Sequence, residues 1–371
     1  MSSQVPSGLD SDPTAYLALP RFNKTLDFPV DSELAGGGDT ATVTYALTDA
    51  PSDGSWPLLV FFNGLGGHRL IASLIEGIGR EHQVQILAID KPNGGGSAQG
   101  VSLPLHLRTR WMHTALLAVL TSEHRARFAI FSHSNGVFYS LYTLLHLPPT
   151  LTMTSWTLSA PFVPHKISGN IGLGIAAALP TALPNAFGSL LQIVPPVARA
   201  ANWSSGLLSA PSSSTQAESI AALEARKSPH EREYMHRSVG SACRVEVMRR
   251  SLAESRVAIG QETLFCLHGS SSTGGETVWG LGVGASDAEV LRGAFSRLVE
   301  RYPGDALSMR VVYGAADGLV PTKGRVWLKA TLEELELLRD EQAWTEVSGA
   351  GHDDVLFREE VMSGMLKRVV R

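Results

Sequence analysis

The apolar residues of the chain follow two alternating patterns. Short runs of consecutive apolar residues are typical of strands buried on both faces of a parallel sheet. Runs of this strand character lie at 58–62, 84–89, 128–131, 155–159, 309–314 and 344–348. Stretches with helical spacing lie between them, over about 70–81, over about 105–123 and after residue 136. The alternation predicts an α/β protein with a doubly wound, mostly parallel sheet.

Two N-terminal segments have patterns of their own. Residues 1–25 are rich in proline, serine and aspartate, and we expect them to form an extended arm. Residues 40–47 alternate apolar and polar side chains, which predicts an early edge strand after a glycine-rich turn at 36–39.

The β-α alternation stops between about residues 165 and 305. Residues 167–217 contain one charged residue, Arg199, in 51 positions, together with five prolines. Helices are expected over 218–226, 229–237, 244–257 and 287–302, the last capped by Ser286 or Asp287. The sequence therefore predicts an α/β core of residues 26–164 and 306–371, interrupted by a large helical cap of residues 165–305.

Composition excludes several classes of protein. The net charge of −4 argues against a nucleic-acid partner. Two cysteines, Cys243 and Cys266, cannot build a disulfide framework, so reducing conditions are expected. The N-terminus has no basic region followed by an apolar one, as a secretory signal would. These features predict a cytoplasmic protein.

A serine lies between one predicted strand and the helix after it. The segment Ser132-x-Ser134-x-Gly136 matches the G-x-S-x-G pattern of a nucleophile elbow, with serine replacing the first glycine. Asp317 lies just past the predicted strand at 309–314, and His352 follows the strand at 344–348. Serine, aspartate and histidine thus occur in this order, each after a predicted strand.

With these three motifs, the chain resembles the α/β-hydrolase superfamily over about residues 40–371, apart from the insert. The resemblance implies that Ser134 is the nucleophile and that His352 is its general base. Asp317 would orient the imidazole. Asp353 and Asp354 are rivals for that role but rank below Asp317, because side chains adjacent to a histidine rarely reach back to orient its ring.

The same resemblance implies two backbone N–H donors for an oxyanion. One belongs to Asn135, the residue after the nucleophile. The other is Leu65 in the loop Asn63-Gly64-Leu65-Gly66-Gly67, where Asn63 replaces the histidine more usual in the family. Gly64 and Gly66 would let the backbone approach the substrate closely.

Several further motifs receive smaller roles. His133 is expected to pack beside the nucleophile rather than serve as a second base. The loop at 90–97 resembles the family's D-x-P-G-x-G-x-S loop, which is structural there, so no catalytic role is assigned to it. His268-Gly269 resembles the His-Gly pair of the family's oxyanion loop, but it lies in the insert and is not expected to bind the oxyanion. No H-E-x-x-H motif or paired cysteine spacing predicts a metal, and no cofactor is expected.

The uncharged stretch from residue 167 has three interpretations. It forms a cap that packs on the core, or it forms an apolar ceiling over Ser134, with Leu179 and Leu183 lining the substrate pocket. A membrane span is the least favoured, because Pro180 and Pro184 interrupt the best window. Membrane contact is therefore possible but not expected.

The sequence predicts a cofactor-free serine esterase acting on an apolar small-molecule or lipid-like ester through an acyl-enzyme. Carbon–carbon bond hydrolases and thioesterases use the same three residues and stay open as alternatives. A third alternative is a ligand receptor with a hydrolase fold and little or no turnover, which a fluorophosphonate probe would distinguish. The sequence leaves the oligomeric state open.

Overall fold

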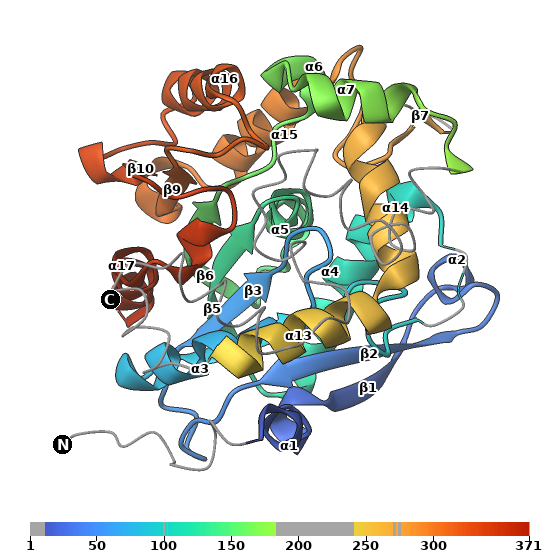
Figure 1. Ribbon diagram of the computed structural model, residues 1–371, viewed down its shortest axis with the longest axis vertical. Helices are drawn as coiled ribbons and strands as arrows, with labels where there is room; N and C mark the ends of the chain where they lie inside the picture. Colours follow the sequence, from blue (N-terminus) through green and yellow to red (C-terminus); the bar gives the residue numbers. More distant parts are fainter. Residues whose placement is uncertain are drawn as a thin grey trace.

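A sheet of eight strands forms the centre of the protein (Figure 1). The computed structural model describes residues 12–98, 101, 103–182, 241–269, 272–273 and 276–370. The strands are β1 (Lys24–Pro29), β2 (Thr40–Leu47), β3 (Leu58–Phe62), β4 (Gln85–Ile89), β5 (Arg127–His133), β6 (Thr152–Ser159), β9 (Met309–Gly314) and β10 (Trp344–Val347). Their order is β1-β2-β4-β3-β5-β6-β9-β10, with β2 antiparallel to both neighbours and β4 through β10 parallel. The predicted doubly wound, mostly parallel sheet is confirmed.

Helices cover both faces of this sheet. Those of the core are α1 (Pro13–Leu17), α2 (Ser32–Ala35), α3 (Ile71–Glu81), α4 (Arg108–Ser122), α5 (Gly136–His146), α16 (Thr322–Glu334) and α17 (Glu359–Val370). The described residues also form short 3-10 helices at Pro20–Phe22, Leu105–Leu107, Gly304–Ala306, Glu341–Ala343 and Asp354–Phe357. Helices α4 and α5 pack on one face, and α3 and α17 pack on the other.

Strand β3 shows why both faces are covered. Leu58, Val60 and Phe62 belong to the hydrophobic cluster on the α4–α5 face, whereas Leu59 and Phe61 belong to the cluster on the α3–α17 face. Successive side chains of a strand point to opposite faces, so an uninterrupted apolar run needs cover on both. Each fully buried side chain of this size contributes about 1.5–3 kcal/mol to folding.

Two predictions for the N-terminal region are wrong. The described part of the expected arm is not extended: it forms α1, and Tyr16 and Leu17 are buried against the core. The Tyr16 hydroxyl donates a hydrogen bond of 2.7 Å to the carboxylate of Glu76 on α3. Strand β2 has the predicted bounds but is not an edge strand, because β1 pairs with its outer side.

The insert between β6 and β9 is helical where the structure describes it. It contains α6 (His165–Ser168), α7 (Ile171–Ala178), α13 (Ser241–Glu254), α14 (Arg256–Leu267), α15 (Asp287–Arg301) and the small hairpin of β7 (Ser272–Thr273) and β8 (Glu276–Thr277). The single helix expected over 244–257 is two helices that meet at Ser255. The helices expected at 218–226 and 229–237 lie outside the described residues.

Helix α15 belongs to the core and not to the predicted cap. Its residues Leu291, Phe295 and Leu298 join the hydrophobic cluster of α4 and α5, and Phe295 packs against Trp156 of β6. The helix thus continues the β-α alternation between β6 and β9. Its N-cap is Ser286, one of the two caps predicted from the sequence, and the Ser286 side chain accepts a hydrogen bond from the N–H of Glu289.

Within the described ranges, no helix combines the length and the apolar character that crossing a membrane requires.

Candidate active site

Ser134 lies in the sharp turn between β5 and α5. Its φ is +52°, a conformation rarely adopted by residues other than glycine. A Cβ on Gly136 would lie 2.4 Å from the carbonyl oxygen of Phe62, so only glycine fits where α5 passes β3. Ser132, which replaces the usual first glycine, is fully buried and its Oγ accepts a hydrogen bond of 3.1 Å from Trp156 Nε1. The elbow therefore accommodates this departure from the pattern.

The structure brings Ser134, Asp317 and His352 together. His352 Nε2 lies 2.9 Å from Ser134 Oγ, and His352 Nδ1 lies 2.8 Å from Asp317 Oδ2. The other oxygen of Asp317 accepts hydrogen bonds of 2.9 Å from the N–H groups of Leu319 and Val320, which fixes the carboxylate. All three side chains of this Ser–His–Asp set are buried. The three come from loops at the carboxyl ends of β5, β9 and β10, where open α/β sheets carry their sites.

The environment of His352 favours its protonated form. Burial lowers the pKa of the imidazole, but the negative charges of Asp317 and Asp353 raise it by more. The net result is a pKa above the ordinary value of 6.5. The histidine is therefore a stronger base than an exposed imidazole.

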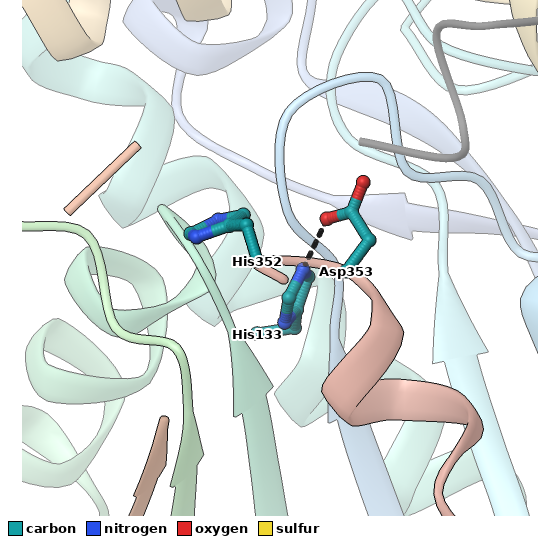
Figure 2. A group of neighbouring side chains, drawn as sticks. All are labelled: His133, His352 and Asp353. Atoms are coloured by element: carbon teal, nitrogen blue, oxygen red, sulfur yellow. Dashed lines mark hydrogen bonds and ion pairs between the residues drawn. The ribbon is translucent and has the colours of Figure 1, made fainter. Parts of the chain in front are cut away.

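Asp353 does not replace Asp317 but pairs with His133. His133 Nε2 lies 2.9 Å from Asp353 Oδ1 (Figure 2), and His133 Nδ1 lies 3.3 Å from Ser159 Oγ. Burial lowers the pKa of His133, so its ring is neutral near pH 7. Although burial raises the pKa of Asp353, the hydrogen bond with His133 and the positive charge of Arg244 lower it by more, so the carboxylate stays ionised. Asp354 instead accepts the N–H of Gly351 within its own turn.

His133, His352 and Asp353 form a group of metal-ligand type. In the structure, however, the ring nitrogens of His352 are directed to Ser134 and Asp317, and in Figure 2 they point away from Asp353. The three residues thus belong to two separate histidine–carboxylate pairs, His133–Asp353 and His352–Asp317, whose imidazole rings lie 5.2 Å apart. His133 lies beside Ser134 in the pocket wall, as expected, but its partner Asp353 was not anticipated.

The peptide groups Ser134–Asn135 and Gly64–Leu65 are both held by hydrogen bonds to their carbonyl oxygens. The Ser134 oxygen accepts hydrogen bonds from the N–H groups of Phe162 and Val137, at 3.1 and 3.2 Å. The Gly64 oxygen accepts the N–H of Gly67 at 3.0 Å. In a trans peptide the N–H points opposite to the C=O, so these bonds orient the N–H groups of Asn135 and Leu65. Neither N–H has a protein acceptor among the described residues.

The glycines of the loop after β3 serve different purposes. Gly64 and Leu65 line the pocket beside Ser134, whereas Gly66 does not. Gly66 instead adopts a φ of +70°, which turns the loop. A Cβ on Gly67 would lie 2.3 Å from the Cβ of Asn63, so the loop closes tightly on itself.

The pocket over Ser134 is mainly apolar and has walls from both the core and the insert. From the core come Phe61, Ile71, Leu74, Phe162, Leu319, Leu356 and Phe357. From the insert come Leu173, Val247, Met248, Cys266 and Leu267, together with Arg244, Ser251 and Thr263. Polar side chains are the minority in this wall, so most of the surface offered to a ligand is hydrocarbon.

The prediction that Leu179 lines this pocket is wrong. Leu179 follows the end of α7, its side chain is 43% exposed, and it is not part of the pocket wall. Leu173 is the buried residue of α7 and reaches the pocket in its place. Leu183 lies outside the described residues. His268 and Gly269 are also outside the pocket wall, in agreement with the sequence-based expectation.

A buried group of charges lies beneath the loop after β3 and the elbow. Lys91 and Arg108 both contact the carboxylate of Glu262, with shortest separations of 2.7 and 2.8 Å, and Tyr139 donates its hydroxyl to the same carboxylate. Burial raises the pKa of Glu262, but the two positive charges lower it to about 2. The loop at 90–97 was expected to have a structural role only, yet it brings Lys91 to the site.

The backbone resembles several solved structures at low sequence identity. A membrane phospholipase A described as a bacterial virulence factor is 13% identical, with 96% of this chain and 91% of that chain covered and a TM-score of 0.52. A peroxisomal α/β-hydrolase from Saccharomyces cerevisiae is 15% identical (94% and 88% covered, TM-score 0.51). An esterase from Rhodococcus is 14% identical (94% and 98% covered, TM-score 0.50).

No protein-family model and no curated protein matches the sequence. The strand order, the elbow between β5 and α5 and the structural neighbours nevertheless agree with one another. The chain has the α/β-hydrolase fold.

Proposed function

We propose that this protein is a serine hydrolase that cleaves carboxylic esters with an apolar acyl group through an acyl-enzyme. The observation that carries the proposal is the unbroken hydrogen-bonded chain from Ser134 through His352 to Asp317 at the floor of an apolar pocket. A phospholipase and an esterase among the structural neighbours support ester chemistry on this fold.

In the first half of the reaction, Ser134 Oγ attacks the ester carbonyl while His352 Nε2 accepts its proton. Asp317 accepts a hydrogen bond from His352 Nδ1–H and stabilises the imidazolium that forms. The negative charge that develops on the carbonyl oxygen would be received by the N–H groups of Leu65 and Asn135. The tetrahedral intermediate then collapses, and the imidazolium returns its proton to the departing alcohol.

In the second half, His352 takes a proton from a water molecule that attacks the acyl-enzyme. The same two N–H groups receive the new oxyanion, and Ser134 leaves with the proton from the imidazolium. The products are the carboxylic acid and the regenerated enzyme. The chain needs no further group for this sequence, because the nucleophile, base and oxyanion donors are all its own.

The substrate class follows from the pocket wall. Hydrocarbon side chains dominate it, so an acyl chain gains up to about 0.8 kcal/mol for each methylene that it buries. We therefore expect kcat/KM for p-nitrophenyl esters to rise with chain length until the pocket is full. An apolar alcohol of a lipid-like ester would fit the same wall.

The test combines this ester series with Ser134→Ala. The variant should stay folded and lose at least about a thousandfold in kcat, because the members of such a set act as a unit. A fluorophosphonate probe should label the wild type rapidly and Ser134→Ala not at all. Retention of a tenth of the activity would remove Ser134 from the mechanism.

The remaining alternatives give different results in the same assays. Ligand-induced melting shifts without labelling would favour a receptor. Labelling with no ester turnover, but with cleavage of thioesters or of carbon–carbon bonds, would keep the nucleophile and change the substrate class.

A further inference from the structure

Lys91 lies two residues after the end of β4, and its side chain is buried, with 4% of its surface exposed. Its Nζ lies 2.9 Å from the oxygen of Gly64, 3.0 Å from Asn135 Oδ1 and 2.7 Å from Glu262 Oε2. An ammonium group has three hydrogens, so these three acceptors account for all of them. A lysine is almost never buried unless it is paired, and here every partner is a defined atom at the site.

The contact with Gly64 acts on the neighbouring N–H. The carbonyl of Gly64 and the N–H of Leu65 belong to one planar trans peptide group. A cation on the oxygen therefore keeps the N–H of Leu65 turned to the opposite side. Gly67 donates to the same oxygen, but an ammonium donor makes the stronger, charge-assisted hydrogen bond.

The contact with Asn135 acts on the second donor. The side-chain oxygen of Asn135 accepts from Lys91, and its Nδ2 donates to Glu262 at 2.7 Å. Both ends of the amide are thus held by charged groups. The N–H expected to meet the oxyanion belongs to the backbone of this same residue, so the side chain anchors it at the start of α5.

Glu262 comes from the insert and gives Lys91 its counter-charge. It lies on α14, 171 residues from Lys91 in the sequence. Its second carboxylate oxygen accepts Arg108 Nε at 2.9 Å and the Tyr139 hydroxyl. With Lys91 and Arg108 positive and Glu262 negative, the buried group carries one net positive charge. A developing oxyanion nearby is stabilised by such a charge.

We propose that Lys91 and Glu262 are positioning residues that hold the N–H groups of Leu65 and Asn135 in the orientation that receives the substrate oxyanion. Because Glu262 is on α14, the oxyanion hole is complete only when this helix of the insert is docked. The inference rests on the proposed serine-hydrolase function and adds to it how the insert controls the reaction.

The principal test is Lys91→Met, which keeps the length of the side chain and removes the charge. We expect kcat for p-nitrophenyl butyrate to fall about tenfold to a hundredfold, less than the loss of a whole donor, with KM within about threefold of wild type. A fall in kcat with little change in KM is expected of a positioning residue, because the N–H donors that it orients stabilise the transition state more than the bound substrate. Lys91→Arg should recover part of the loss, since it restores a cation.

Glu262→Gln provides a second variant that keeps the shape of the side chain. Its matched control is Glu76→Gln, since Glu76 is also buried and accepts a tyrosine hydroxyl and an arginine, but its hydrogen bonds go to Tyr16, Arg21 and the N–H of Asp49 instead of to Lys91 and Asn135. Both variants should lose stability, but only Glu262→Gln should lower kcat, by about tenfold. If Lys91→Met does not fold, this pair carries the test. Equal kcat for Glu262→Gln and Glu76→Gln would overturn the proposal.

A crystal structure of the folded Lys91→Met variant separates this inference from the proposed function. We expect the peptide between Gly64 and Leu65 to rotate, so that the Leu65 N–H leaves its wild-type direction. An unchanged peptide, or kcat within threefold of wild type, would overturn the positioning role. Absence of hydrolysis of every ester by the wild type would overturn the proposed function instead, and the structure would still decide the role of Lys91.

Discussion

The backbone of Ser134 is strained, because its φ is positive. Such a conformation costs a residue other than glycine about 1–3 kcal/mol. The strain is held by the ends of β5 and α5, which are both buried in the core. Its hydroxyl oxygen already lies 2.9 Å from His352 Nε2. At the scale of single residues, the candidate site is therefore preorganised before a substrate arrives.

The raised pKa of His352 predicts the pH dependence of turnover. The imidazole must be neutral to accept the serine proton, and its folded-state pKa lies above 6.5. Activity should therefore be full at higher pH and fall as the pH drops through that pKa. The acid limb of a kcat/KM–pH profile should have its midpoint above 6.5.

Asp353→Asn should move this midpoint to lower pH. The charge of Asp353 is one cause of the raised pKa of His352, and without it the protonated ring is less stable. Asp354→Asn is the control, because Asp354 holds the N–H of Gly351 and an asparagine oxygen can do the same. A midpoint that stays unchanged in Asp353→Asn would show that the second histidine–carboxylate pair does not act on the base.

The sequence located the residues that stand in local motifs. Ser134, Asp317 and His352 each follow a strand within a few positions, so the strand pattern and the short motif together were sufficient to find them. The partners of His133 and Lys91 could not be found in this way. Asp353 is 220 residues from His133, and Glu262 is 171 residues from Lys91, so only the folded chain brings them together.

At the scale of elements, the junction of β3, β5 and α5 fixes the elbow. Gly136→Ala would place a methyl group 2.4 Å from the Phe62 oxygen, which is backbone and cannot turn away. We expect a loss of at least about 1–3 kcal/mol of stability, together with most of the activity, measured by thermal melting and ester turnover.

Gly293→Ala is the matched control for this substitution. Gly293 is also a helical glycine, but on the exposed face of α15 with no atom near an added Cβ. Alanine should stabilise that helix by up to about 1 kcal/mol and leave turnover unchanged. Similar melting temperatures for the two variants would contradict the close packing of α5 on β3.

The elements were predictable to different degrees for physical reasons. The buried strands were found nearly at their observed bounds, because burial on both faces leaves a continuous apolar run. The place of α15 was not found, because a capped amphipathic helix has the same pattern in a core layer and in a cap. The start of the chain was predicted wrongly as an extended arm. Only Tyr16 and Leu17 of α1 are buried, and two apolar residues in a mostly polar segment do not indicate packing against the core.

At the scale of the whole molecule, the pocket over Ser134 lies where the core and the insert meet. Ser134 and its partners come from the core, whereas Leu173, Val247 and Met248 come from the insert. Under the proposed function, the reacting side chains belong to the core, and the apolar insert wall contributes to the choice of substrate. Changes in the insert wall should alter selectivity for acyl chains while leaving the reaction on short esters intact.

Val247→Thr tests this division with a change that keeps the shape of the side chain. Val247 is buried and lines the pocket, so an acyl chain that covers it would leave the new hydroxyl without a partner, at a cost of about 1–3 kcal/mol. We expect kcat/KM for p-nitrophenyl octanoate to fall at least about fivefold, and that for the acetate to stay within twofold. Val257→Thr is the control, because Val257 is 59% exposed on α14. Equal losses on both esters would show that Val247 supports the fold of the insert and does not contact the acyl chain.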